Sequence, residues 1–166
     1  MDDNISATED SIQLNTGNED ELIEEKYVND DGEDAIRTYT KGKFLGKGGF
    51  AKCYDFICIE DNQSFAAKIV SKQNLQKSSS KQKVYKINKS KLKSEIKIHK
   101  SLNHKNIVKF EHVFEDENNV YILLELCKNK TLNELHKKRK TLTEMEVRFY
   151  LEQIVNSVKY KLNINI

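Results

Sequence analysis

A glycine-rich turn is the first feature of this sequence whose spacing suits chemistry. It reads Leu45-Gly46-Lys47-Gly48-Gly49-Phe50-Ala51-Lys52-Cys53-Tyr54 and lies between two segments rich in strand-forming residues. Glycines let backbone N–H groups approach phosphate oxygens without interference from a Cβ atom. A strand rather than a helix is predicted after the turn, and no Gly-Lys-Ser/Thr follows, so it is neither a Rossmann turn nor a Walker A loop. An ordinary hairpin turn remains the alternative on this evidence.

A lysine and a glutamate supply the next candidate pair. Lys68 lies in the apolar segment Phe65-Ala66-Ala67-Lys68-Ile69-Val70, where its ammonium needs a partner. Glu95 is the one acidic residue among ten lysines in residues 72–100. A lysine that reaches solvent from a strand edge and a solvated helix glutamate are the alternatives. We expect the two to pair, because pairing neutralises both charges.

The elements that must position these residues follow from hydrophobic periodicity. Strands are predicted at residues 38–46, 51–59 and 65–70, and again at 107–114 and 120–126. Between the two groups, residues 72–83 are predicted to be a loop, and a helical period of apolar residues begins at Lys91. Five mostly sequential strands with one crossing helix predict an α+β fold with a five-stranded antiparallel sheet.

Two helices are predicted at the C-terminal end of the sequence. Thr131 with Glu134, and Thr143 with Glu146, have the spacing of a capping box. The second helix carries an apolar face made by Val147, Tyr150, Leu151, Ile154, Val155 and Val158. Because nothing in the remaining sequence covers this face, we expect the isolated chain to be marginally stable, prone to self-association, or dependent on a protein partner that covers the helix.

Composition and charge exclude several classes of protein. No apolar run approaches the ~20 residues that span a bilayer, and no secretory signal pattern begins the sequence. The three cysteines form no Cys-x-x-Cys pair, and the histidines show no metal-ligand spacing with them, which favours reduced thiols and no metal site. Lysine-rich residues 72–100 contain one aromatic residue, Tyr85, so nucleic-acid binding is unfavoured.

The net charge of +2 conceals two opposite parts. Residues 1–36 hold thirteen acidic residues and one lysine, a net charge of −12, whereas residues 37–166 carry +14. Dense negative charge with few apolar residues predicts that residues 1–36 form an acidic disordered tail. Residues 37–166 are then the folded module.

Taken in order, the glycine hairpin, strand lysine and helix glutamate resemble the N-terminal lobe of protein kinases. The residues of these motifs are similar to those of the polo-like kinases in particular. The matching segments are Gly46 to Cys53 with Ala in place of the third glycine, Phe65 to Val70, Glu95 to His104, Phe114-Glu-Asp116, Leu124-Glu-Leu-Cys127 and Leu135 to Glu144. The resemblance spans residues 38 to about 160 and implies an N-lobe at 38–127, a hinge, and two helices of an incomplete C-lobe at 128–166.

This resemblance implies an ATP site. Its loop over the phosphates would consist of Gly46, Lys47, Gly48, Gly49, Phe50 and Ala51. Leu45, Cys53 and Ala66 would line the adenine pocket, and Leu124 would be the gatekeeper residue at its rear. The backbones of Glu125 and Cys127 would bind the adenine edge. Lys68, held by Glu95, would bind the α- and β-phosphates. Ile122 and Leu123 are interpreted as core residues.

Two departures from the family pattern bear on function. The Lys68–Glu95 interval is longer than the family usually has; we interpret the extra residues as a solvated surface insertion, or alternatively as a site for acidic partners. No His-Arg-Asp or Asp-Phe-Gly segment, the family's source of the catalytic base and Mg²⁺ ligands, occurs in the 166 residues.

We therefore expect a truncated kinase domain that binds ATP and is inactive as this chain, although the family is enzymatic. The alternative is a non-catalytic nucleotide- or partner-binding module. The resemblance also implies an intracellular location, at the nucleus, centrosome, kinetochore or spindle.

Overall fold

Six strands and three helices make up the part of the chain that this computed structural model describes. That part is residues 21–49, 51–73 and 82–164, with the backbone alone for 82–88. The elements are β1 (Leu22–Val28), β2 (Asp34–Lys47), β3 (Ala51–Cys58), β4 (Ser64–Ser71), α2 (Gln82–Ser101), β5 (Phe110–Glu115), β6 (Asn119–Glu125), α3 (Leu132–Arg139) and α4 (Glu144–Asn163).

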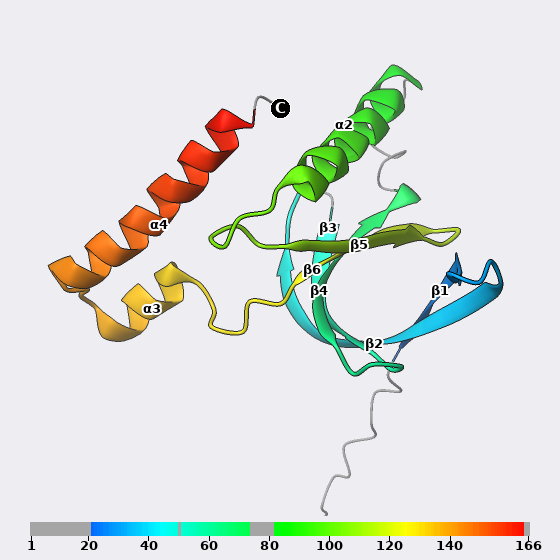
Figure 1. The fold of residues 1–166 in the computed structure, drawn as a ribbon, viewed down its shortest axis with the longest axis horizontal. Helices are drawn as coiled ribbons and strands as arrows, with labels where there is room; N and C mark the ends of the chain where they lie inside the picture. The colour runs from blue at the N-terminus through cyan, green and yellow to red at the C-terminus, as the bar shows by residue number, and fades with distance from the viewer. Residues whose placement is uncertain (1–20, 50, 74–81, 165–166) are drawn as a thin grey trace, which may run out of the picture.

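The strands form a single antiparallel sheet in the order β1-β2-β3-β4-β6-β5. The sheet is strongly curled, so that β1 and β5, which are its two edges, approach each other (Figure 1). Strand β2 follows this curl over 14 residues, with register shifts between Lys41 and Phe44 and between Phe44 and Gly46. Such bulges increase the local twist of a strand.

The prediction of five strands is corrected to six. Strand β1 lies within residues 1–36, which we expected to be disordered, and β2 also begins before residue 37. The two strands are joined by a turn in which Gly32 has φ of 83°. Residues 21–36 are therefore ordered, because their alternation buries Ile23 and Glu25 against the sheet. Residues 1–20 lie outside the described residues.

The concave inner face of the curled sheet holds the main core. Tyr39, Phe56, Tyr121 and Leu123 are buried there, together with Ile23, Cys58 and Ala67. The rings of Tyr39, Phe114 and Tyr121 stack in series, with centroids 5.4 Å and 4.7 Å apart. Burial of Leu123, and of Ile122 on the opposite face, confirms their interpretation as core residues.

Helix α2 packs against the opposite face of the sheet. Leu92 of the helix contacts a small cluster formed by Ala51, Val70 and Val120. Near the C-terminal end of the helix, His99 Nε2 lies 2.8 Å from the carbonyl oxygen of Val108. The helix begins at Gln82, nine residues before the predicted start at Lys91. Most of the predicted loop that precedes it, at residues 74–81, lies outside the described residues.

Helices α3 and α4 lie beside the sheet rather than on it (Figure 1). Both predicted capping boxes are formed: Thr131 Oγ1 accepts from the Glu134 N–H, and Thr143 Oγ1 from the Glu146 N–H. Helix α4 contacts the loop after α2: the Tyr160 Oη accepts a hydrogen bond from the Asn103 N–H at 2.9 Å.

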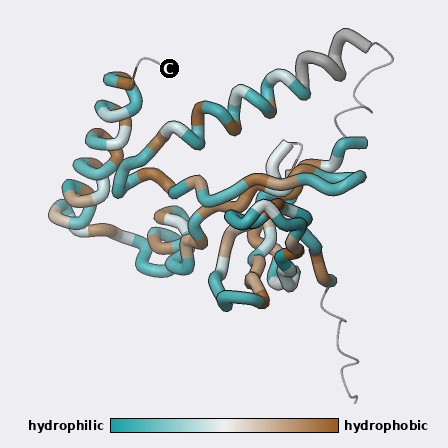
Figure 2. The backbone as a smooth tube through the Cα atoms, turned by 45° about the vertical axis from the view of Figure 1, so that its right-hand side comes forward, coloured by the Kyte–Doolittle hydropathy of each residue, from teal (hydrophilic) through white to brown (hydrophobic). Residues whose placement is uncertain are grey.

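Apolar and polar segments alternate along α4 (Figure 2). Its apolar side chains, including Val147, Leu151, Ile154 and Val158, are largely exposed. No helix in residues 21–49, 51–73 and 82–164 has the length and hydropathy needed to cross a bilayer.

Candidate functional site

The glycine-rich turn joins β2 to β3 as a hairpin. Gly46 pairs with Cys53 and Lys47 with Lys52, and the Gly48 N–H donates to the Ala51 carbonyl at 2.9 Å. A Cβ atom added at Gly46 or Gly49 would meet nothing within 4 Å, so one side of the loop is open. Gly49 and Lys47 are exposed, and Phe50 lies outside the described residues.

The sheet register brings the predicted pocket residues onto one face. In an antiparallel pair, directly opposite residues point to the same side. Cys53 is opposite Lys68, and Ala66 is opposite Leu124 in the next strand. Because Ala66 and Lys68 are two residues apart, all four side chains share the face that α2 also covers.

Lys68 and Glu95 pair as predicted. The Lys68 ammonium donates to Glu95 Oε1 across 27 residues of sequence, from the middle of β4 to the middle of α2. The Lys68 side chain is 27% exposed and that of Glu95 is 54% exposed. A lysine ammonium has three donors, so two remain for an anion beside this pair.

The Cys53 thiol lies next to the Lys68 ammonium. Burial raises the pKa of this thiol above its ordinary value, and the positive charge of Lys68 opposes the increase. The net direction is upward, so the thiol is protonated at neutral pH. A protonated thiol is a weak nucleophile, so its chemical environment does not favour a nucleophilic role for Cys53.

The end of β6 contributes to the site in addition to the glycine hairpin and the Lys68–Glu95 pair. Leu124 is half-buried, whereas the side chains of Glu125 and Cys127 are exposed, which leaves their backbones as the groups that lie against the sheet. The Glu125 N–H already donates to the Lys109 carbonyl at 3.0 Å. Any role of Glu125 in binding therefore falls on its carbonyl oxygen.

Two further residues, Leu45 of β2 and Asp55 of β3, lie near these side chains in the sheet. Leu45 sits at the second bulge of β2, next to Gly46, and is half-exposed. Asp55, which the sequence reasoning did not single out, pairs with Ala66 on the site face. Its Oδ1 atom is buried without a hydrogen-bond partner among the described residues. The alternation of Ala51, Cys53 and Asp55 along β3 was the available signal.

The arrangement suits a ligand with a flat apolar part and a negatively charged part. Small and aliphatic side chains (Cys53, Ala66 and Leu124) offer room against the sheet, and Lys68 with the glycine hairpin offers positive charge and backbone donors. Within the described part of the chain, no three His, Cys, Asp or Glu residues gather in a way that could hold a metal ion.

Comparison with known proteins agrees with this geometry. A family model described as "Protein kinase domain" matches residues 39–166. The chain is 55% identical over 131 residues to a probable serine/threonine-protein kinase PLK of Dictyostelium discoideum. It is 54% identical over 139 residues to the probable kinase CCRP1 of Zea mays, and 52% identical over 124 residues to the kinase polo of Drosophila melanogaster.

These alignments cover most of this chain but little of each relative. They span 79%, 84% and 75% of the chain, in the order given, but only 13%, 21% and 20% of the relatives. The similarity therefore concerns one segment of much longer proteins.

Proposed function

The chain belongs to the protein kinase domain family, with polo-like kinases as homologues, and on that premise we propose that it is the ATP-binding portion of a serine/threonine kinase domain. The observation that carries the proposal is the Lys68–Glu95 pair on the same sheet face as Cys53, Ala66 and Leu124. It places a charged anchor and small or aliphatic side chains on one face of the sheet.

The adenine would lie against the apolar part of this face. Ala66 and Cys53 are small enough to admit a flat ring, Leu45 would close it from the loop side, and Leu124 would limit its depth. The Glu125 carbonyl and the Cys127 N–H would bind the adenine edge. This division agrees with the Glu125 N–H being taken by Lys109.

The phosphates would lie between the glycine hairpin and Lys68. The hairpin from Gly46 to Ala51 would present backbone N–H groups other than that of Gly48, which donates to Ala51. The Lys68 ammonium would contact the α- and β-phosphate oxygens while Glu95 fixes its direction. Mg²⁺ normally accompanies ATP in kinases, where it neutralises the charge of the phosphates. The described residues supply no cluster of ligands for it.

We assign no phosphoryl transfer to these 166 residues by themselves. Transfer needs a carboxylate that orients the attacking hydroxyl and residues that hold the metal, and the family takes both from His-Arg-Asp and Asp-Phe-Gly segments absent from this sequence. A cell-cycle role is an expectation from the polo-like resemblance alone. An intracellular location at the nucleus or spindle is the corresponding expectation.

Nucleotide titration tests the proposal. We expect the purified chain to bind a fluorescent ATP analogue more weakly than micromolar, because one side of the nucleotide is uncovered. Lys68→Met should abolish this binding. Lys52→Met is the control, since Lys52 is an exposed lysine of the same hairpin on the other face. Equal binding by wild type and Lys68→Met would refute the site, and phosphate transfer that Lys68→Met abolishes would refute the assignment of inactivity.

A non-catalytic partner-binding module is the second candidate. The observation that favours it is the exposed apolar face of α4, where Val147, Leu151, Ile154 and Val158 meet solvent. A partner that covers this face would bury surface that is costly to leave in water. Light scattering measures the self-association of the purified chain with and without Leu151→Glu. Self-association that Leu151→Glu reduces would show that the apolar face of α4 binds other protein surfaces, and equal scattering would show that it does not.

A further inference from the structure

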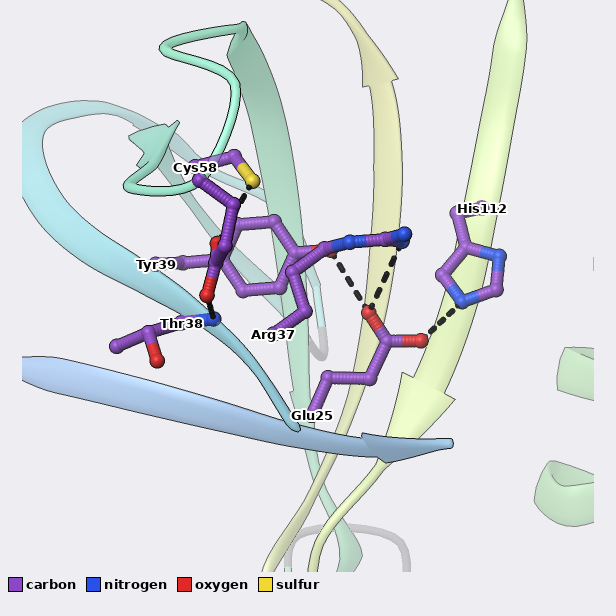
Figure 3. Close-up of polar contacts among 7 residues, drawn as sticks. Glu25, Arg37, Thr38, Tyr39, Cys58 and His112 are labelled. Carbon is purple, nitrogen blue, oxygen red and sulfur yellow. Dashed lines mark hydrogen bonds and ion pairs between the residues drawn. The ribbon is translucent and has the colours of Figure 1, made fainter. Parts of the chain in front are cut away.

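A buried carboxylate lies between the two edges of the sheet, away from the proposed nucleotide site. Glu25 in β1 is only 2% exposed. Its Oε2 accepts a hydrogen bond from Tyr39 Oη at 2.7 Å, and Arg37 Nη1 lies 3.8 Å from the same oxygen. Its Oε1 contacts His112 Nε2 (Figure 3). Both carboxylate oxygens are thus satisfied by donors from other strands.

The position of these donors in the sheet is the informative point. Tyr39 and Arg37 belong to β2, the neighbour of β1, but His112 belongs to β5, the strand at the opposite end of the sheet order. Among the strands in the described part of the chain, β1 pairs only with β2, and β5 pairs only with β6. Glu25 therefore joins two edges that no backbone ladder connects.

An aromatic contact lies beneath the same junction. The Tyr39 ring stacks on Phe114 of β5 with an interplanar angle of 11°, and His112 stacks on Phe114 with centroids 6.3 Å apart. The Glu25 carboxylate holds both the Tyr39 hydroxyl and the His112 ring over this stack. A buried carboxylate is costly unless its oxygens are paired, so opening the junction leaves Oε1 without its contact to His112.

We propose that β1 is a clasp that closes the curled sheet, with Glu25 as the residue that fastens it to His112 at the β5 edge. The clasp lies outside residues 39–166, the part that matches the family model. The clasp holds β5. This strand adjoins α2, because the carbonyl of Val108, just before β5, contacts His99 of that helix. The ordered sheet therefore extends to Leu22, before the residues that match the family model.

Hydrogen exchange measured by mass spectrometry on the 166-residue chain tests the clasp. The variants are Glu25→Gln, His112→Phe and their combination. His112→Phe keeps a ring to stack on Phe114 but removes the nitrogen that contacts Glu25. Glu21→Gln is the matched control, because Glu21 makes the same type of contact, with Lys41 at 2.6 Å, from an exposed position beside β1.

The expected result is faster exchange in two segments that are distant in sequence. Each clasp variant should accelerate the amides of both β1 and β5 by about tenfold or more, the size expected when a charge-assisted hydrogen bond is lost. The double variant should be no faster than Glu25→Gln, since both changes remove one interaction. Glu21→Gln should leave β5 unchanged.

Acceleration confined to β1, or equal acceleration in Glu21→Gln, would overturn the proposal. If Glu25→Gln does not fold, His112→Phe alone decides the matter, because the His112 side chain is 45% exposed and its replacement leaves the hydrogen bond from Tyr39 to Glu25 in place. Unchanged exchange of β5 in that variant would refute the clasp.

Discussion

Replacing Glu95 by Gln tests whether the Lys68–Glu95 ion pair serves nucleotide binding or the stability of the fold. The change keeps the size of the side chain and removes the negative charge that faces Lys68. The exposure of the pair sets its contribution to the free energy of unfolding. The Lys68 and Glu95 side chains are 27% and 54% exposed, so water screens the attraction between them. Exposed ion pairs contribute about 0–1 kcal/mol to the free energy of unfolding.

Glu95→Gln should therefore lower the melting temperature by less than about 5 °C, the shift that about 1 kcal/mol produces in a domain of this size. Nucleotide binding should respond more strongly. Without Glu95, the Lys68 ammonium loses its fixed direction and with it one charge-assisted contact to phosphate, so affinity should fall by about tenfold.

Thermal unfolding followed by circular dichroism, together with titration of a fluorescent ATP analogue, measures both quantities. Glu144→Gln is the control: Glu144 pairs with Arg148 at 3.1 Å on the exposed surface of α4, far from the site. The reasoning is refuted if Glu95→Gln lowers the melting temperature by more than about 10 °C, or if it binds the nucleotide as tightly as the wild type does.

Three further predictions follow from the core, a helix cap and the thiols. Phe56→Ala should cost about 3–5 kcal/mol, because Phe56 is fully buried between Tyr39 and Tyr121, and a urea midpoint within error of the wild type would contradict this. The Thr143 N–H and then Arg139 lower the pKa of Glu146 to about 2, so its capping bonds stabilise α4 above the ordinary pKa near 4.5 and are lost as pH falls towards 2. Helicity of Glu146→Gln should accordingly change less than that of the wild type over this interval, and identical acid titrations would contradict the assignment. Iodoacetamide at pH 7 should modify exposed Cys127 first and Cys58 last, since burial and then the bond to Glu60 raise the pKa of Cys58 to about 11; mass spectrometry gives the order, and early labelling of Cys58 would count against it.

Much of the site was predictable because its parts are set by local sequence and strand register. The glycine hairpin, the lysine of β4 and the glutamate of α2 each have a local signal, and the period-2 alternation of β3 and β4 is enough to align Cys53, Ala66 and Lys68. The pairing of Lys68 with Glu95 followed from charge alone. The loop position of Phe50 and the roles of individual residues toward ATP stay predictions.

The first strand was missed because its inward positions mix apolar and charged residues. In Leu22–Val28 the buried side chains are Ile23 and Glu25, so the alternation that marks a strand is hidden by an inward carboxylate. Composition then favoured disorder. The turn Asn29-Asp-Asp-Gly32 was the overlooked signal, since it is typical of a hairpin between this segment and the next. No local rule reveals that His112, 87 residues away, would satisfy Glu25.

The closure of this sheet by side chains also governs how the protein meets other copies of itself. A barrel closed by backbone hydrogen bonds has no edges, whereas here β1 and β5 are each paired on one side only among the described strands, and an unpaired strand edge can recruit further strands. Each edge carries charges that oppose such pairing, with Glu24 and Lys26 on β1 and Glu111 and Glu115 on β5. Glu24, one of the acidic residues that disguised the first strand, thus belongs to a set of edge charges that disfavours edge-to-edge aggregation of the folded sheet.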